Sequence, residues 1–217
     1  MLVLASVSPR RRELLTQAGY SFQVHPAQIP EEPLANEEPI AYVTRLARGK
    51  AEAVYSEITH AGASEQRGSA PPLVVLGADT TVTLDGQILG KPTDTADAAR
   101  ILRLLSGRTH SVLTGVAVVT AEGATIAAEI TAVQFNLLAE EEIAAYIATG
   151  EPMDKAGAYA IQGRAARWIP RIEGCYFNVV GLPIALVCRL LDARLTGNQL
   201  SSLTSSNAAI PLRGATK

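Results

Sequence analysis

Three consecutive arginines follow a serine–proline pair close to the start of the chain. Ser8 is of a type that caps helix N-termini, and Pro9 suits the first helical position. Arg10, Arg11 and Arg12 are therefore expected in the first helical turn. Helical stability alone would favour acidic side chains there, because a helix N-terminus already carries partial positive charge. Guanidinium groups beside free backbone N–H groups instead predict a site for phosphate oxygens, with a solvated basic face as the alternative and Arg12 as the most exposed of the three.

Asp79 follows a continuous apolar run, residues 73–76, that is typical of a buried central strand. A carboxylate at the C-terminal end of such a strand would lie at the crevice where open α/β sheets bind ligands. It could bind a divalent cation, activate a water molecule, or do both. The alternative on position alone is an aspartate that caps the following turn. The neighbouring phosphate-binding candidates favour the functional interpretation.

Two lysines and a glutamine are further candidates. Lys91 is held on a short segment between a glycine and Pro92, and Lys50 lies on a predicted long helix. Either ammonium could act as a point charge for a phosphate, and the sequence alone leaves both undecided against a solvent-facing position. Gln162 lies in a stretch rich in glycine and alanine, and its amide is suited to reading a base edge. This stretch is weak evidence by itself, because it has neither Rossmann nor P-loop spacing.

These residues must be positioned by alternating strands and helices. The pattern predicts an α/β architecture, as one large domain or two small lobes. Strands are expected at 2–5, 22–25, 73–76, 81–84, 87–89, 112–120 and 125–135, and helices begin near Pro9, Pro39, Thr95, Glu140 and Pro183. Residues 62–72 have the composition of a solvated insertion loop and residues 197–217 that of a disordered tail, so the domain is expected to span residues 1–196.

Composition and charge exclude several classes of protein. The 217 residues are 47% hydrophobic, which is enough for a substantial core, and 19 Lys and Arg face 21 Asp and Glu. A formal charge of −2 gives no global basic field, so no nucleic-acid partner is expected. Cys175 and Cys188 are too few for a disulfide framework, and neither has the neighbours that a zinc site requires. Without a signal sequence or a run of about 18 apolar residues, a cytoplasmic protein with no membrane partner is expected.

Taken in order, these segments resemble the Maf family of nucleoside triphosphate pyrophosphatases from about Leu4 to Pro183, apart from the 62–72 insertion. The matching segments are S-x-S-P-R-R-x-E-L-L from Ser6, the acidic segment near Glu31, R-L-A-x-x-K-A from Arg45, G-A-D-T from Gly77, L-G-K-P from Leu89, S-G-R-T-H from Ser106, T-G-E-P-x-D-K-A-G-A-Y-x-I-Q-G from Thr149 and N-V-V-G-L-P from Asn178. The ordered set is highly specific, whereas each segment alone is not.

The resemblance implies a mixed, twisted sheet flanked by helices around a central cleft, similar to the inosine triphosphate pyrophosphatases. It also implies a homodimer that uses Mg²⁺ or Mn²⁺. By position, Asp79 would be the base that activates water, and Glu31 would share the metal with it. The triphosphate would be bound by Ser8, Arg10, Arg11, Lys50 and Lys91. Arg11, Thr80 and Gln162 match the specificity positions of the branch that hydrolyses dTTP and UTP to the monophosphate and pyrophosphate.

Three residues depart from the family pattern. Pro30 stands where the acidic segment often has Asp, Ala165 replaces a common Gly, and Cys175 replaces a common Ser. Pro30 bears most directly on the metal environment near Glu31. Two alternatives stay open beside the pyrimidine reaction. One is a 7-methyl-GTP or broad-specificity purine pyrophosphatase, and the other is a nucleotide-binding regulator, since the family is also associated with the arrest of septum formation.

Overall fold

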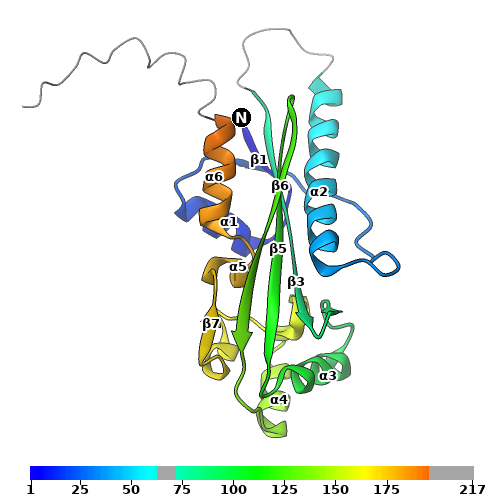
Figure 1. Ribbon diagram of the computed structural model, residues 1–217, viewed down its shortest axis with the longest axis vertical. Helices are drawn as coiled ribbons and strands as arrows, with labels where there is room; N and C mark the ends of the chain where they lie inside the picture. The colour runs from blue at the N-terminus through cyan, green and yellow to red at the C-terminus, as the bar shows by residue number, and fades with distance from the viewer. Residues whose placement is uncertain (63–71, 196–217) are drawn as a thin grey trace, which may run out of the picture.

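The computed structural model describes residues 1–62 and 72–195 (Figure 1). The strands are β1 (Leu2–Leu4), β2 (Gln23–Val24), β3 (Val74–Leu84), β4 (Gln87–Leu89), β5 (Thr109–Thr120), β6 (Gly123–Gln134) and β7 (Arg171–Glu173). The helices are α1 (Pro9–Gln17), α2 (Pro39–Gly62), α3 (Thr95–Leu105), α4 (Glu140–Ile147), α5 (Tyr176–Val180) and α6 (Ile184–Leu195), with short 3₁₀ turns η1 (Glu151–Asp154), η2 (Ala156–Ala158) and η3 (Arg164–Trp168). Residues 63–71 of the expected insertion and the expected tail, 197–217, lie outside the described residues.

One mixed sheet organises the molecule, in the order β2-β1-β3-β5-β6-β7, with β4 also paired to β3. β1 is parallel to both β2 and β3, and the remaining pairs are antiparallel. β3, β5 and β6 run along the length of the molecule, with α2 on one side and α1 and α6 on the other (Figure 1). The predicted mixed α/β architecture is confirmed. Among the described helices, none is both long and apolar enough to cross a membrane.

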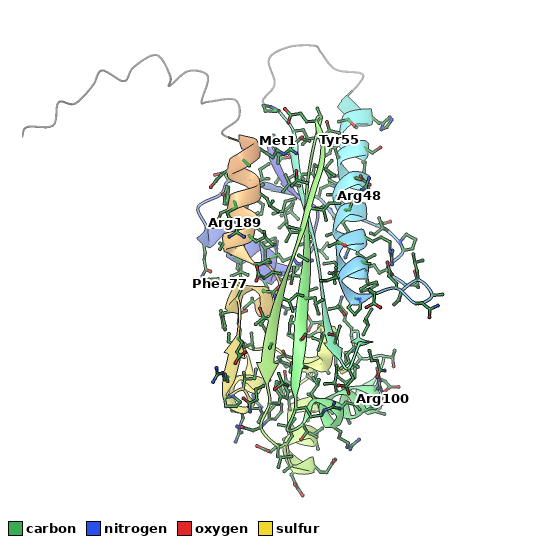
Figure 2. The ribbon with its side chains drawn as sticks, in the orientation of Figure 1. Met1, Arg48, Tyr55, Arg100, Phe177 and Arg189 are labelled. Carbon is green, nitrogen blue, oxygen red and sulfur yellow. The ribbon has the colours of Figure 1, made fainter. Side chains whose placement is uncertain are left out.

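Alternation along the strands divides the apolar side chains between two cores. Val3 and Val75 belong to the smaller core, which α2 covers with Ala47, Ala51 and Val54. The residues that alternate with these strand positions pack with α1 and α6 in the larger core, which includes Leu2, Leu4, Leu14, Leu15, Leu76, Val187 and Leu191. Side chains fill the space between each layer of helices and the sheet (Figure 2).

The structure corrects the expected position of Asp79. The sequence placed it at the C-terminal end of a strand over residues 73–76, but β3 continues unbroken from Val74 to Leu84 and Asp79 lies in its middle. The strand continues because β5 pairs with it over residues 75–83, past the point where β1 ends. β1 pairs with residues 74–76 and β4 with residues 82–84. In the described part of the chain, residues 77–81 have no strand on that edge, so Asp79 faces a gap in the sheet.

Helix α2 lies unusually close to the sheet at two glycines. A Cβ on Gly77 would lie 2.2 Å from the carbonyl oxygen of Ala47, and a Cβ on Gly115 would lie 2.2 Å from that of Val43. Gly115 is the register partner of Asp79. The two glycines therefore let the backbone of α2 cross the sheet beside Asp79, which brings the helix side chains within reach of the gap.

Candidate active site

A cleft of about 510 Å³ opens at the gap in β3. Its wall combines the turn from β1 into α1, the segment before α2, the middle of β3, the segment after β4, residues 154–162 and the end of α5. The site residues that the sequence predicts all line it: Ser8, Arg10, Arg11, Glu31, Lys50, Asp79, Thr80, Lys91 and Gln162. The fold therefore gathers candidates that are spread over more than 150 positions of sequence.

Lys50 joins the two predicted metal-binding carboxylates. Its Nζ lies 2.7 Å from Oδ1 of Asp79 and 2.6 Å from Oε1 of Glu31. Lys50 and Asp79 are both only 8% exposed. Partial burial raises the pKa of Glu31, but the hydrogen bond and the positive charge of Lys50 outweigh it, so this pKa lies below its ordinary value. Glu31 is therefore held ionised beside Asp79.

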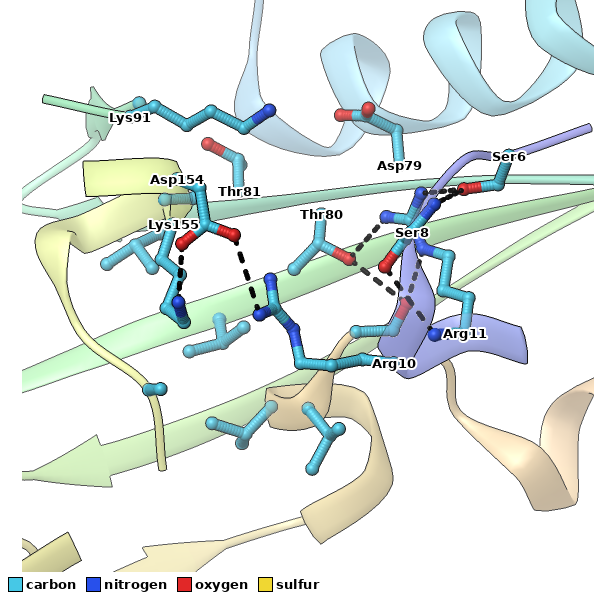
Figure 3. A pocket seen from close by; sticks show the side chains of 18 of the residues that line it. Ser6, Ser8, Arg10, Arg11, Asp79, Thr80, Thr81, Lys91, Asp154 and Lys155 are labelled. Atoms are coloured by element: carbon cyan, nitrogen blue, oxygen red, sulfur yellow. Dashed lines mark hydrogen bonds and ion pairs between the residues drawn. The ribbon is translucent and has the colours of Figure 1, made fainter. Parts of the chain in front are cut away.

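Arg11 ties α1 to the sheet. Its guanidinium donates to the carbonyl oxygens of Gly181 and Ala78, both at 2.8 Å, and to the hydroxyl oxygens of Ser6 at 3.2 Å and Thr80 at 3.1 Å (Figure 3). Four of the five guanidinium N–H groups are thus used within the protein, which leaves one N–H on Nη2 for a ligand. Burial lowers the pKa of Arg11, and the negative charge of Asp79 opposes this shift.

The start of α1 has the predicted form. Ser8 caps the helix, and its Oγ accepts the backbone N–H of Arg11 at 3.5 Å. No acidic residue lies in the first turn. Arg10 points across the cleft and lies 3.8 Å from Asp154 on η1, while Arg12 is exposed. The free N–H groups and Arg10 therefore present positive charge to the cleft.

Asp154 and Lys155 are cleft residues to which the sequence reading gave no role. Lys155 Nζ contacts Asp154 Oδ1 at 2.5 Å and donates to the carbonyl oxygen of Glu151 at 2.8 Å. Asp154 thus lies between Lys155 and Arg10 (Figure 3). Both residues lie in the T-G-E-P-x-D-K segment, and their place in that motif is the sequence feature that could have identified them as site residues.

Lys91 and Gln162 are exposed in the cleft and carry no hydrogen bond or ion pair to any residue in 1–62 or 72–195. The Lys91 ammonium extends toward the side of β3 from which Asp79 projects (Figure 3). Thr80 differs from both, because its hydroxyl already contacts Arg11, Thr114 and the carbonyl oxygen of Gly181. Among the predicted substrate-binding residues, Lys91 and Gln162 therefore have side chains that are free to bind a substrate.

The carboxylates fit a hard divalent cation that shares its coordination with a ligand. Glu31 and Asp79 both contact the ammonium nitrogen of Lys50, so the two carboxylates lie close together in the cleft. Within the described ranges, no group of three or more His, Cys, Asp or Glu could form an all-protein metal cage. Two carboxylates together with phosphate oxygens and water match the usual coordination of Mg²⁺. Pro30, beside Glu31, does not prevent this glutamate from lining the cleft.

Comparison with known proteins identifies the family. The family model described as Maf-like protein matches residues 1–194. This chain belongs to the Maf-like family. A relative from Koribacter versatilis, named dTTP/UTP pyrophosphatase, is 51% identical over 190 residues, or 88% of this chain and 92% of the relative. Relatives of the same name from Citrifermentans bemidjiense and Moorella thermoacetica are each 53% identical over 194 residues, or 88% of this chain and 93% of each relative.

Membership of the Maf-like family confirms the resemblance that the ordered motifs indicated. The cleft also contains a residue that lies outside those motifs and that sequence reasoning missed, because its contact joins two separate segments. This residue is Tyr42, whose hydroxyl donates to the carbonyl oxygen of Glu31 at 2.9 Å. Burial, together with the charges of Asp79 and Glu31, raises the pKa of Tyr42 to about 12. Tyr42 thus stays a neutral hydrogen-bond donor at physiological pH.

Proposed function

We propose that this protein hydrolyses dTTP and UTP to the nucleoside monophosphate and pyrophosphate. The observation that carries the proposal is the convergence of Asp79, Lys50 and Glu31 in a cleft that also holds the arginine-bearing start of α1. Relatives about 50% identical over most of the chain bear the name dTTP/UTP pyrophosphatase. Phosphoryl transfer is accelerated mainly by positioning and by cations placed around the phosphate oxygens, and this cleft supplies both.

Asp79 is the proposed general base. Its Oδ1 is occupied by Lys50, whereas its Oδ2 accepts no hydrogen bond from the described residues. Oδ2 would take a proton from water as the water oxygen bonds to the α-phosphorus. The bond between the α-phosphorus and the bridging oxygen to the β-phosphorus would break, and pyrophosphate would leave with that oxygen. Ser8, Arg10, Arg11 and Lys91 would hold the triphosphate oxygens, and Lys50 would orient the Asp79 carboxylate through the contact to its Oδ1.

Glu31 and Asp79 are the proposed ligands of a divalent cation, Mg²⁺ or Mn²⁺. When bound, it would neutralise charge on the phosphate oxygens. Ionised Glu31 suits this role because Lys50 keeps its pKa below the ordinary value. Gln162 would read the uracil or thymine edge with its amide, since it is exposed in the cleft and has no partner within the described residues. Arg11 and Thr80, which also line the cleft, would contribute to specificity.

The chain would act in the cytoplasm, where nucleoside triphosphates are found, as a homodimer. Ile126 and Ile130, which lie on the same face of β6, are 39% and 46% exposed. These apolar side chains are candidates for the surface between two copies of the chain.

The function is tested with Asp79→Asn, which keeps the shape of the side chain and removes the base. We expect pyrophosphate release from dTTP to fall by about 10²–10⁴-fold, the usual contribution of a general base. The matched control is Asp85→Asn, because Asp85 lies in the turn after β3 and pairs with Arg108 at the surface. Pyrophosphate release by Asp79→Asn at the wild-type rate would refute the assigned role.

Substrate choice is tested with a panel of dTTP, UTP, 7-methyl-GTP and purine triphosphates at one fixed metal concentration. We expect dTTP and UTP to be preferred. Gln162→Ala should reduce that preference by about 10-fold, because the loss of one desolvated hydrogen bond to a ligand has about this effect. A purine preference of the wild-type protein would instead support the broad or 7-methyl-GTP enzyme. Tight nucleotide binding without turnover would support a regulator.

A further inference from the structure

A bidentate ion pair holds the acidic loop, residues 31–38, against α2. Arg45 Nε donates to Oε1 of Glu37 at 2.6 Å, and Arg45 Nη2 donates to Oε2 at 2.7 Å. The Glu37 side chain is only 7% exposed, although it lies in a loop where the neighbouring residues are solvent exposed. We call this pair the Arg45–Glu37 clamp.

The clamp also organises the backbone of the acidic loop. Arg45 Nη2 donates to the carbonyl oxygen of Glu32 at 3.1 Å. Glu37 Oε2 accepts the backbone N–H of Leu34 at 3.0 Å, and the N–H of Glu37 donates back to the carbonyl oxygen of Leu34 at 3.1 Å. The loop is therefore closed on itself and tied to the helix by the same carboxylate.

The same helix presents Lys50 to the end of the loop. Tyr42, three residues before Arg45, donates to the backbone of Glu31 at 2.9 Å, and Lys50 binds the Glu31 side chain at 2.6 Å. Tyr42, Arg45 and Lys50 all extend from α2 (Pro39–Gly62). One continuous helix therefore anchors the loop and also binds the Glu31 carboxylate. The position of Glu31 relative to Asp79 thus depends on how firmly the loop is held.

From these contacts we infer that Arg45 and Glu37 are positioning residues for the reaction, which hold Glu31 at Lys50 and Asp79 without contacting the substrate. This inference rests on the role proposed above for Glu31. The competing interpretation is an ordinary surface ion pair, which contributes little to any property of a protein. The burial of the Glu37 carboxylate and the fork geometry argue against it, because bidentate arginine–carboxylate pairs are strong and directional.

The chain offers a matched comparison on the same helix. Arg48, labelled in Figure 2, pairs with Glu52 at 2.7 Å, but both side chains are about half exposed and neither forms a hydrogen bond or ion pair with the described residues 31–38. Arg45→Lys keeps the positive charge and removes the bidentate guanidinium contact with Glu37. Arg48→Lys is the same substitution at a site where only a surface ion pair is affected. A difference between these two variants therefore reports on the clamp and not on a general effect of replacing arginine in α2.

The test is a double-mutant cycle that joins Arg45→Lys to Glu31→Gln, with dTTP turnover measured at saturating and limiting Mg²⁺. We expect Arg45→Lys to lower kcat/KM by about 10-fold in the wild-type background and by less than about 2-fold when Glu31 is already Gln, because the clamp acts only through Glu31. Arg48→Lys should remain within about 2-fold of wild type in both backgrounds. Equal losses from Arg45→Lys in the two backgrounds would overturn the inference.

Hydrogen exchange of the metal-free protein gives a second readout, independent of turnover. We expect Arg45→Lys and Glu37→Gln to speed the exchange of the Leu34 and Glu37 amides, with α2 and β3 unchanged. Unchanged exchange at these two amides would overturn the inference, and Glu37→Gln serves if Arg45→Lys does not fold. If the wild type turns over dTTP but Glu31→Gln has full activity, the role of Glu31 and this inference both fail. If the wild type releases no pyrophosphate, the proposed function itself fails.

Discussion

Single side chains in this protein show how burial changes ordinary chemistry. His110 is 2% exposed and lies among aromatic rings, 5.0 Å from the ring of Phe135 and 5.3 Å from that of Tyr159. Its Nε2 lies 2.8 Å from the Tyr159 hydroxyl, whereas its Nδ1 has no partner within the described ranges. Burial lowers the pKa of His110 to about 4, because a charged imidazole would lose its hydration there. His110 is thus neutral in the folded protein at physiological pH.

We predict that His110 makes stability depend on pH in the mildly acidic range. Its pKa is about 4 when folded and about 6.5 when unfolded, so between these values the unfolded chain binds the extra proton. The contribution of neutral His110 to the free energy of unfolding is complete above about pH 6.5. It falls by about 3 kcal/mol as the pH drops from 6.5 through 4. Urea denaturation at several pH values should show a shallower loss of unfolding free energy in His110→Gln than in wild type.

The exposed histidine His60 provides the control for this prediction. His60→Gln should retain the wild-type loss of stability between pH 6.5 and 4, because that loss is assigned to His110. The assignment would be wrong if His110→Gln lost stability between pH 6.5 and 4 as steeply as the wild type does.

Among the elements, α2 has the largest influence on the site. It covers the smaller core with its apolar side, and the two glycines of the sheet bring its backbone into contact with β3 and β5. This close approach accompanies the contact of Lys50 with Asp79 at 2.7 Å. The same approach supports the position of Tyr42 and Arg45 beside the acidic loop.

Gly77→Ala should therefore damage both stability and activity. The new Cβ would lie 2.2 Å from the carbonyl oxygen of Ala47, so the helix or the strand must move. We expect a loss of about 3 kcal/mol in unfolding free energy, at the upper end of overpacking effects, and a fall in kcat as Lys50 shifts from Asp79. Gly90→Ala is the control, because a Cβ there meets no atom within 4 Å. Equal stability of the two variants, measured by urea denaturation, would contradict the close-packing argument.

The whole molecule consists of two cores on opposite faces of one sheet, with the cleft where the sheet edge is interrupted. The larger core extends from α1 and α6 to the aromatic cluster near α3 and α4, and the smaller core lies under α2. Cleft residues come from both sides of this division, so the site depends on the complete fold. The exposed isoleucines on β6 lie outside both cores.

We predict that the proposed homodimer depends on these isoleucines. Ile130→Glu places a charge on a side chain that is 46% exposed, so a monomer would tolerate it while an apolar interface would not. Light scattering after gel filtration should give the mass of a dimer for the wild type and about half of it for this variant. Val24→Glu, at 41% exposure on β2, is the control and should remain dimeric. A dimeric Ile130→Glu protein would exclude this surface.

The sequence by itself determined the elements and the residue types of the site. Apolar alternation and helix caps predicted most strands and helices, and ordered motifs predicted the family that the comparisons confirm. These signals are local, because strand and helix geometry repeat over two to four residues. The same local signals predicted that the strand ends before Gly77. This was wrong, because residues 73–81 contain no local pattern that indicates the pairing of β5 with β3 beyond Gly77.

Only the tertiary structure decided which atoms meet. Lys50 and Asp79 are 29 residues apart, and Arg11 and Gly181 are 170 apart, so their contacts depend on strand register and on how closely α2 crosses the sheet. The four internal hydrogen bonds of Arg11 and the Arg45–Glu37 clamp follow from the same packing. The sequence specifies the residue type at each position directly. The distances between segments depend instead on how all the side chains of the close-packed core fit together.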